Sequence, residues 1–151
     1  MSEILLLATN DKHVVAVCEA VASMIGLVVR RCRSGREIFA ALRRPGDEVD
    51  VSSIKIALID DDLQDMSGHQ LVPLIRDQDP DLKIVYMAQT LDPEVEVRVR
   101  QAGVHCMMDK PIEATLLEKL LRKMRDNETT RIYYPADPDR SRATFTTRKH
   151  P

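Results

Sequence analysis

Residues 54–68 read IKIALIDDDLQDMSG, and this stretch decides how the rest of the chain is interpreted. Five of its first six residues are apolar, and the run ends in three adjacent aspartates, Asp60, Asp61 and Asp62. A short apolar run without polar alternation is typical of a strand that is buried on both faces. Adjacent carboxylates repel one another, so a chain that places three of them at the end of such a strand is expected to use at least one. This strand end is the first candidate site.

The composition is that of one folded domain. The chain has 151 residues, of which 44% are hydrophobic and 30% are charged, and its formal net charge is -2. This balance favours neither nucleic acid nor a membrane as a partner. The three cysteines are widely spaced and form no CxxC, which predicts neither a disulfide framework nor a zinc site and favours a cytoplasmic location. We recognise no targeting or transmembrane segment in the sequence.

Short apolar runs alternate along the chain with segments of helical length. The runs that predict strands are residues 4–8, 27–29, 54–59, 84–87 and 104–108. Between these runs, and after the last one, apolar residues recur at the spacing of a helix with one buried face. Five strands that alternate with five helices predict an α/β fold of the (βα)5 type, with a parallel sheet covered by helices on both faces.

One segment, EVEVRVR at residues 94–100, alternates strictly and by its period alone would be a strand. An Asp-Pro pair before it and an Ala-Gly pair after it are typical helix ends, and its place in the βα order requires a helix. We therefore predict a helix. In that helix Val97 cannot share one narrow face with Val95 and Val99, so part of the apolar surface should be exposed.

The last part of the chain differs in character from the rest. Residues 127–151 contain two prolines before the terminal one and show no hydrophobic periodicity, which predicts a flexible C-terminal tail after a domain that spans residues 1–126. No regular structure is expected after about residue 128. The polar segment at residues 45–53 predicts a long loop between the second helix and the third strand.

Ligands of an open parallel sheet bind at the carboxyl ends of its strands, beside the point where the strand order reverses. If the first and third strands are neighbours, Asn10 and Asp11 come close to Asp60. Lys110, at the end of the fifth strand, would close this acidic pocket. We assign no role to the four histidines, which show no metal-ligand spacing.

Two stretches, ALIDDDLQDMSG and AGVHCMMDKPI, resemble the receiver domain of two-component response regulators, the CheY-like family, over about residues 3–126. The resemblance rests on Asp60 with Gly68 eight residues later, and on Lys110-Pro111 seven residues after Gly103. It implies a flavodoxin-like, doubly wound parallel sheet with strand order 2-1-3-4-5. It also implies a phosphoprotein that acts in phosphorelay signal transduction.

The same resemblance implies roles for individual residues. Asp60 would be the phosphoacceptor, and Lys110 would pair with the phosphoryl oxygens. Mg2+ would be held by Asp60, by an acidic pair at the end of the first strand and by the backbone carbonyl of Asp62. The physical reason is charge, because phosphoryl transfer to a carboxylate brings anions together that a divalent cation and an ammonium group must neutralise.

The sequence departs from this pattern at the acidic pair. The pair falls on Thr9-Asn10 or, after a slip of one residue, on Asn10-Asp11, and the wholly apolar first strand cannot fix the register. Mg2+ binding is therefore expected to be weak or lost. The position of the expected switch hydroxyl is Ala88, with Thr90 nearby.

We interpret the chain as a stand-alone atypical receiver, without enzymatic activity, that works by protein–protein interaction and whose Asp60 is weakly phosphorylated or not at all. Asp60 is expected to be ionised and close to Lys110. One alternative is a conventional Mg2+-dependent receiver phosphorylated on Asp60 by a histidine kinase. A second is a phosphohydrolase similar to haloacid dehalogenases, suggested by Asp60-x-Asp62 but disfavoured by Gln64, where a hydroxyl residue is expected.

The expected partner is a histidine kinase or a downstream signalling protein, and a homodimer is compatible with the sequence. We place the partner face on the fourth helix, the fifth strand and the fifth helix. The residues that motivate this choice are Val95, Val97, Val99 and Met107, since methionine stands where the family has an aromatic residue and suits an adaptable contact surface.

Overall fold

The computed structural model describes residues 3–43, 54–90, 92–126, 131–134 and 144–147. One sheet runs through the molecule in the order β2-β1-β3-β4-β5-β6-β7. The strands are β1 Ile4–Ala8, β2 Val28–Cys32, β3 Ile54–Asp60, β4 Lys83–Ala88, β5 Cys106–Asp109, β6 Arg131–Tyr134 and β7 Thr144–Thr147. The helices are α1 Lys12–Ile25, α2 Gly35–Arg43, α3 Gly68–Gln78, α4 Pro93–Ala102 and α5 Ala114–Asp126.

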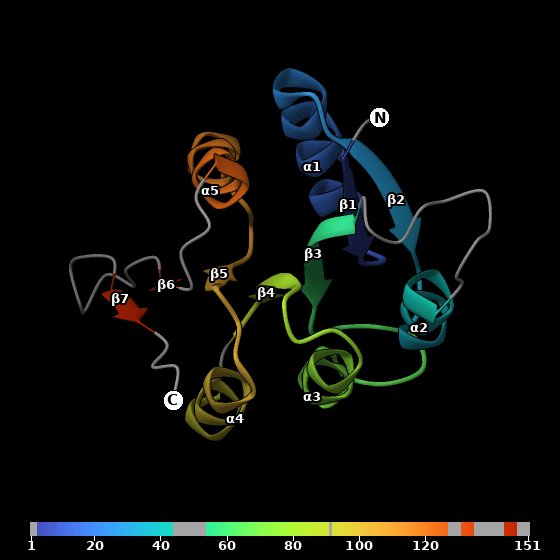
Figure 1. Cartoon of the computed structure of the whole chain (residues 1–151), viewed down its shortest axis with the longest axis vertical. Coiled ribbons are helices and arrows are strands. Elements are labelled where there is room, and N and C mark those ends of the chain that lie inside the picture. The colour runs from blue at the N-terminus through green and yellow to red at the C-terminus, as the bar shows by residue number, and fades with distance from the viewer. Residues whose placement is uncertain (1–2, 44–53, 91, 127–130, 135–143, 148–151) are drawn as a thin grey trace.

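The helices cover both faces of the sheet. Helices α1 and α5 lie on one face, and α2, α3 and α4 lie on the other (Figure 1). Successive residues of β1 contribute to different faces, because Leu5 packs in the core with Val14 of α1 while Leu6 packs in the core with Ile38 of α2. A strand covered on both faces needs apolar residues at every position, which explains the unbroken apolar runs. The predicted (βα)5 fold with strand order 2-1-3-4-5 is confirmed.

Strand β2 is longer than the sequence predicts. The prediction covered residues 27–29, whereas the strand extends from Val28 to Cys32 and includes Arg30 and Arg31. The reason is its position at the edge of the sheet, where it pairs with β1. An edge strand is partly solvated, so it accommodates charged residues that a central strand would exclude.

The alternating segment EVEVRVR is a helix, as predicted. The side chain of Asp92 accepts a hydrogen bond of 2.9 Å from the N–H of Glu94, and Gly103 ends α4 with a φ of 99°, in the left-handed region. Val99 is fully buried, whereas Val97 is 51% exposed. The predicted split of the valines between two sides of the helix is therefore confirmed.

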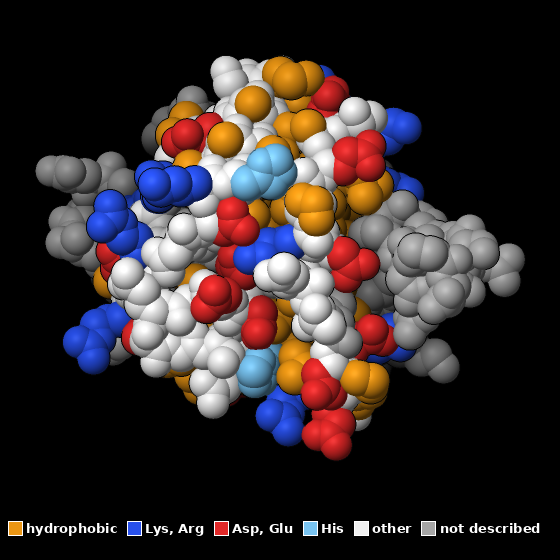
Figure 2. Space-filling view, turned by 180° about the vertical axis from the view of Figure 1, so that it is seen from behind, with side chains coloured by type: hydrophobic (Ala, Val, Ile, Leu, Met, Phe, Trp, Pro, Cys, Tyr) orange, Lys and Arg blue, Asp and Glu red, His pale blue; other side chains and the backbone are white. Residues whose placement is uncertain are grey.

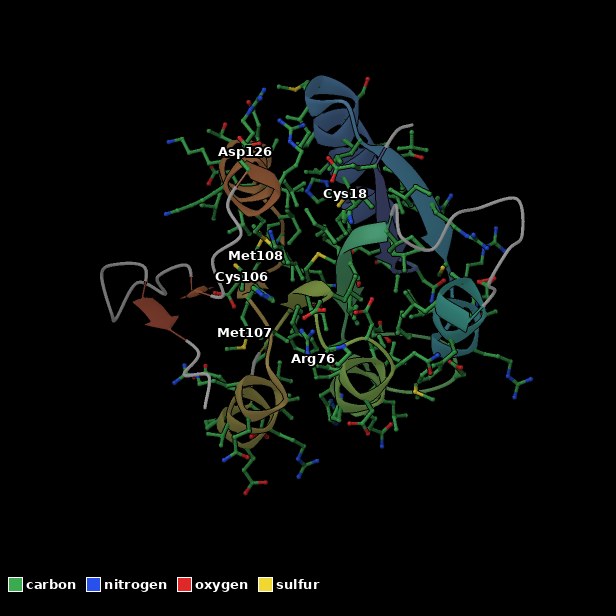
Figure 3. The ribbon with its side chains drawn as sticks, viewed as in Figure 1. Cys18, Arg76, Cys106, Met107, Met108 and Asp126 are labelled. Carbon is green, nitrogen blue, oxygen red and sulfur yellow. The ribbon has the colours of Figure 1, made fainter. Side chains whose placement is uncertain are left out.

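A buried arginine ties the end of α3 to two loops. The guanidinium of Arg76, labelled in Figure 3, donates hydrogen bonds to the carbonyls of Asp79 (3.2 Å), Pro80 (2.8 Å), Leu82 (2.7 Å) and Gly103 (2.6 Å). These carbonyls belong to the segment before β4 and to the end of α4. Arg76 thus fixes the approach of α3 to α4 on that face of the sheet.

The prediction of no regular structure after about residue 128 is wrong, because two strands lie in the C-terminal part. Strand β6 pairs in parallel with β5, and β7 pairs with β6 in antiparallel fashion. The strand sequences RIYY and TFTT are short and rich in residues that favour strands, but they are too short to show a period. The remaining residues of the predicted tail, and the long loop predicted at residues 45–53, lie outside the described residues. The division at residue 126 stays a prediction.

Candidate functional site

The candidate site lies where β1, β3 and β5 end. Asp60 is the last residue of β3, Thr9 follows β1, and Lys110 follows β5. In a parallel sheet the carboxyl ends of neighbouring strands lie on the same side of the sheet, so residues far apart in the sequence come together. Figure 2 shows the molecule from behind Figure 1, with acidic side chains gathered around a basic one near the middle of the view.

Asp60 is almost completely buried, and both of its carboxylate oxygens already accept hydrogen bonds. Its Oδ1 accepts from Lys110 Nζ (3.1 Å) and from the N–H of Asp62 (3.1 Å). Its Oδ2 accepts from Lys110 Nζ (2.9 Å) and from the hydroxyl of Thr9 (2.7 Å). A buried carboxylate needs such donors, because burial without them costs several kcal/mol. Asp60 is thus held from three strand ends.

Lys110 joins Asp60 to a second carboxylate. Its Nζ lies 3.3 Å from Oδ2 of Asp11, and its backbone N–H donates to the carbonyl of Ala88 at 2.9 Å. Partial burial acts to lower the pKa of Lys110, but hydrogen bonding to Asp60, the charge of Asp60 and then Asp11 outweigh it and hold the pKa above its ordinary value. Lys110 is therefore a firmly protonated bridge between two acidic side chains.

Asp11 also begins helix α1. Its Oδ1 accepts the N–H groups of His13 (2.9 Å) and Val14 (3.3 Å), as an N-cap side chain does. Burial acts to raise the pKa of Asp11, but the bonds from Val14, Lys110 and His13 outweigh it, so the pKa is lowered. One carboxylate thus serves both the helix end and the site.

The contacts at the end of β1 differ among Thr9, Asn10 and Asp11. Thr9 is 1% exposed and bonds Asp60, whereas Asn10 is exposed and its side-chain amide donates to the carbonyl of Arg33 at 3.2 Å. Asp11 reaches the site through Lys110. Of the predicted ligands at this strand end, Asp11 is therefore brought to the site and Asn10 is turned toward the loop after β2.

Thr9 is the site residue that the sequence analysis missed. It was treated as one possible member of a lost acidic pair, without a role of its own. The available signal was its place as the first polar residue after an apolar strand, which puts its side chain at the carboxyl edge of the sheet. Alternation in the strand could not give its direction, because every residue of β1 is apolar.

The other predicted residues lie around the pair of Asp60 and Lys110. Asp62 is exposed and takes part through its backbone N–H. Ala88 is buried and contributes its carbonyl, while Thr90 is exposed after the end of β4. Among the described residues, no three acidic, histidine or cysteine side chains are grouped so that they could hold a metal ion.

A second polar cluster, also missed from the sequence, lies next to Asp60. The Oδ1 of Asp61 accepts hydrogen bonds from the hydroxyl of Tyr86 and from the backbone N–H of His69 (3.2 Å), and it lies 2.8 Å from Nδ1 of His69. Burial acts to raise the pKa of Asp61, but the bonds from Tyr86 and His69 lower it overall. This cluster fixes the loop between β3 and α3 against β4.

Gly68 allows that loop to pass close to the end of β3. A Cβ atom at this position would lie 2.5 Å from the carbonyl oxygen of Asp60 and 2.9 Å from Cα of Asp61. The N–H of Gly68 donates to the carbonyl of Asp61 at 2.8 Å. The spacing of eight residues between Asp60 and Gly68 therefore reflects a direct backbone contact.

The predicted partner face is only partly at the surface. Val97 is 51% exposed and Val95 is partly buried, but Val99 is 0% and Met107 is 5% exposed. The prediction that Val99 and Met107 are surface residues is wrong, because Val99 faces the sheet and Met107 lies in a strand that is paired on both sides. Figure 3 shows Met107 and Met108 on β5, and they pack in opposite cores.

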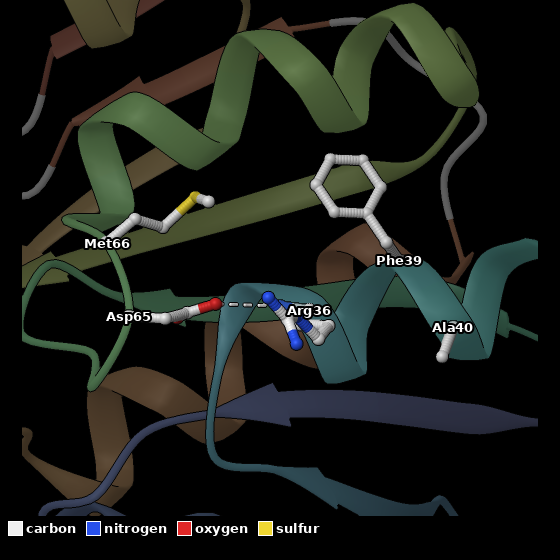
Figure 4. A pocket seen from close by; sticks show the side chains of 5 residues that line it. All are labelled: Arg36, Phe39, Ala40, Asp65 and Met66. Carbon is white, nitrogen blue, oxygen red and sulfur yellow. Dashed lines mark hydrogen bonds between the residues drawn. The ribbon is translucent and has the colours of Figure 1, made fainter.

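A hollow of about 430 Å³ lies between α2 and the loop after β3 (Figure 4). It is lined by Arg36, Phe39, Ala40, Asp65 and Met66. The carboxylate of Asp65 accepts the N–H groups of Gly35 (2.8 Å) and Arg36 (3.1 Å), so it acts as a cap for the start of α2. The hollow is separate from the contacts of Asp60.

Comparison with known proteins places this geometry in a family. The family model of the response regulator receiver domain matches residues 5–122. Ethylene receptor 2 of Arabidopsis thaliana is 27% identical over 122 residues, which are 81% of this chain and 15% of the receptor. The chain therefore spans only about 15% of the length of that curated relative.

Solved structures show the same fold. A CheY-like response regulator receiver domain protein from Methanospirillum hungatei JF-1 is 22% identical, with a TM-score of 0.70, and the match covers 83% of this chain and 96% of that one. A putative response regulator from Chloroflexus aurantiacus J-10-fl is 21% identical, with a TM-score of 0.70, and the match covers 84% of this chain and 100% of that one. No helix within the described ranges is long and apolar enough to span a membrane.

Proposed function

The chain belongs to the family of response regulator receiver domains, and from this premise we propose that it passes on a signal by binding another protein, with weak or no phosphorylation of Asp60. Receiver domains act in two-component phosphorelay signal transduction, through histidine kinases and downstream effectors.

One observation carries the proposal: Lys110 Nζ already contacts both oxygens of Asp60, at 3.1 and 2.9 Å. An ammonium at this distance neutralises the buried carboxylate without a metal ion. The hydroxyl of Thr9 and the N–H of Asp62 complete the set of donors. A conformation that is stable with an unmodified Asp60 needs no phosphoryl group to hold it.

The residues at this site do not fit a resident Mg2+ ion. Receiver domains typically bind Mg2+ in an acidic pocket, and a hard cation requires free oxygen ligands. Here the four carboxylate oxygens of Asp60 and Asp11 all accept hydrogen bonds from N–H or O–H groups. Lys110 lies between the two carboxylates, where its charge repels a second cation. We propose that Mg2+ binding is weak.

The proposed partner is a histidine kinase or a downstream signalling protein. Val97 is the large apolar side chain that α4 leaves exposed, and it supports a contact surface on that helix. We propose that the chain acts through this contact and not as an enzyme. The three cysteines are free and buried, which suits the reducing cytoplasm that we propose as its location.

The conventional mechanism is the second candidate, and a specific observation favours it. Asp60 and Lys110 are both present and in contact, which is the pairing that phosphorylation by a histidine kinase would use. The phosphohydrolase alternative lacks comparable support, since the matched family is that of receivers.

Phosphodonor labelling separates the two candidates. The wild-type protein is incubated with acetyl phosphate and Mg2+ and analysed by intact mass, beside Asp60→Asn as the control. We expect little or no labelling of the wild type, and we expect the output of the protein in its signalling pathway to survive Asp60→Asn. Stoichiometric labelling that disappears in Asp60→Asn would support the conventional mechanism instead.

A further inference from the structure

We propose that Thr9 is a positioning residue whose hydroxyl keeps Asp60 closed to phosphoryl donors, by occupying an acceptor site on Oδ2 that would otherwise be free to react. This inference deepens the proposed function and rests on it. It concerns the neutral side chain that stands at the end of β1, and it assigns to that side chain the low reactivity of the site.

The hydroxyl of Thr9 has a defined direction. Thr9 is 1% exposed, and its Oγ1 accepts the N–H of Asp11 at 3.0 Å. A hydroxyl has one proton to donate, and with a lone pair directed to Asp11 that proton is free for Oδ2 of Asp60, 2.7 Å away. The backbone N–H of Thr9 donates to the carbonyl of Cys32 at 3.2 Å, which holds the residue in place. The donor is therefore preorganised.

Each carboxylate oxygen of Asp60 accepts two donors. Lys110 contributes one to each oxygen, the N–H of Asp62 contributes one to Oδ1, and Thr9 contributes one to Oδ2. A carboxylate oxygen offers about two lone-pair sites. In this arrangement neither oxygen has a site left for attack on phosphorus. Removal of the Thr9 hydroxyl frees a site on Oδ2 and leaves the other contacts in place.

The reaction that Thr9 opposes is a balanced group transfer. An oxygen of Asp60 attacks the phosphorus of an acyl phosphate, a new O–P bond forms, and the O–P bond to the acyl group breaks. The acyl group leaves as a carboxylate with the bonding electron pair, so no net proton is transferred. The attacking oxygen must first give up a hydrogen bond, and a bond between a hydroxyl and a carboxylate is among the stronger ones.

The lack of charge on the Thr9 side chain acts in the same direction as its hydrogen bond. The carboxylates of Asp60 and Asp11 carry two negative charges, and Lys110 carries one positive charge. A neutral hydroxyl adds nothing to this sum, so these three side chains together keep one excess negative charge. An acidic residue in place of Thr9 would add a second, so the hydroxyl leaves less attraction for a divalent cation that would assist the transfer.

The test compares Thr9→Val, Thr9→Ala and Thr9→Ser with the wild type. Valine has nearly the shape of threonine without the hydroxyl, alanine removes the hydroxyl without adding bulk, and serine restores it. Thr115→Val is the matched control, because Thr115 is exposed on α5. Initial rates of labelling by acetyl phosphate are measured by intact mass, and circular dichroism melts verify that each variant is folded.

We expect labelling to be about tenfold faster in Thr9→Val and Thr9→Ala, which is the effect of one lost hydrogen bond to a charged group. Thr9→Ser and Thr115→Val should match the wild type, and Asp60→Asn introduced into Thr9→Val should abolish the labelling. Serine rescue separates this role from simple packing, since serine lacks the methyl group but keeps the donor.

Folded Thr9→Val and Thr9→Ala proteins that are labelled as slowly as the wild type would overturn this inference and leave the proposed function standing. A Thr9→Ser protein labelled as fast as Thr9→Val would also overturn it, because packing would then be the cause. Stoichiometric labelling of the wild type would overturn both the proposed function and this inference.

Discussion

At the scale of the residue, the site is a chain of hydrogen bonds that crosses three strand ends. Thr9 and Lys110 both donate to Asp60, and Lys110 continues to Asp11, whose other oxygen begins α1. A buried ion pair contributes little compared with apolar packing, but loss of one partner leaves an uncompensated charge. The site is therefore sensitive to single substitutions.

Replacement of Lys110 by methionine should destabilise the protein strongly. The change leaves Asp60, which is 1% exposed, without its cation, and the expected loss is about 3 kcal/mol of unfolding free energy. Urea denaturation of Lys110→Met, Asp60→Asn and the double variant measures it. The double variant should be more stable than the sum of the single losses predicts. Additive losses would show that the two side chains are not coupled.

Replacement of Gly68 by alanine should disturb the end of β3. The new Cβ would lie 2.5 Å from a backbone oxygen, so the loop must shift, at a cost of about 1–3 kcal/mol. Gly26→Ala is a useful comparison, since a Cβ there meets nothing within 4 Å and only the φ of 79° is unfavourable. Only Gly68→Ala should also move the amide resonances of Asp60 and Asp61. Unchanged resonances in Gly68→Ala would contradict the close approach.

Residue patterns could predict part of this site from the sequence. Asp60 and Lys110 follow apolar strands, so their approach was predictable from the parallel sheet. The role of Thr9 could not be predicted, because a wholly apolar strand does not show in which direction each side chain points. The contacts of Asp61 with His69 and Tyr86 depend on the path of a loop, which no periodicity describes.

At the scale of the element, strands buried on both faces were readily predicted and edge elements were not. The central strands are apolar throughout, whereas β2 continues through two arginines because it lies at the edge. Helix α4 was predicted from its ends against the period of its interior. The sequence analysis placed Val99 of α4 and Met107 of β5 in the partner face, although both are buried. The apolar residues of a short helix do not by themselves tell which side faces the sheet.

Two substitutions in α4 distinguish its exposed and buried sides. Val97→Glu should change the unfolding free energy by no more than about 0.5 kcal/mol, because Val97 is 51% exposed. Val99→Glu should cost several kcal/mol, since it places a carboxylate in the core. Thermal melts of the two variants at equal pH measure the difference. Similar melting temperatures would contradict the orientation of α4.

At the scale of the whole molecule, two layers of helices cover a mostly parallel sheet, and the charged groups of the site lie at the carboxyl ends of its parallel strands. The stability of such an arrangement depends on pH. Asp11 and Asp61 have lowered pKa values in the folded protein, and Lys110 has a raised one. These carboxylates and this ammonium therefore stabilise the fold most when all of them are charged.

The sign of the pH dependence follows from these directions. A lowered folded pKa contributes stability above the ordinary value of 3.8, which is lost as pH falls below it. The raised pKa of Lys110 contributes stability below 10.5, which is lost as pH rises above it. The urea concentration at the midpoint of unfolding should therefore be highest at pH values between these two limits. Asp61→Asn should reduce the loss of stability that the protein shows at acid pH. Asp77 is exposed on α3, so Asp77→Asn should not have this effect.

We propose that Lys110 holds Asp60 without a metal ion, and nuclear magnetic resonance can detect whether Mg2+ binds there. Mg2+ and then beryllofluoride are titrated into the wild-type protein while the amide resonances of Thr9, Asp60, Ala88 and Lys110 are recorded. We expect no saturable shifts of these resonances at millimolar Mg2+, with or without beryllofluoride. Saturable shifts at Asp60 and Lys110 that disappear in Asp60→Asn would contradict it and would show a working phosphoacceptor site.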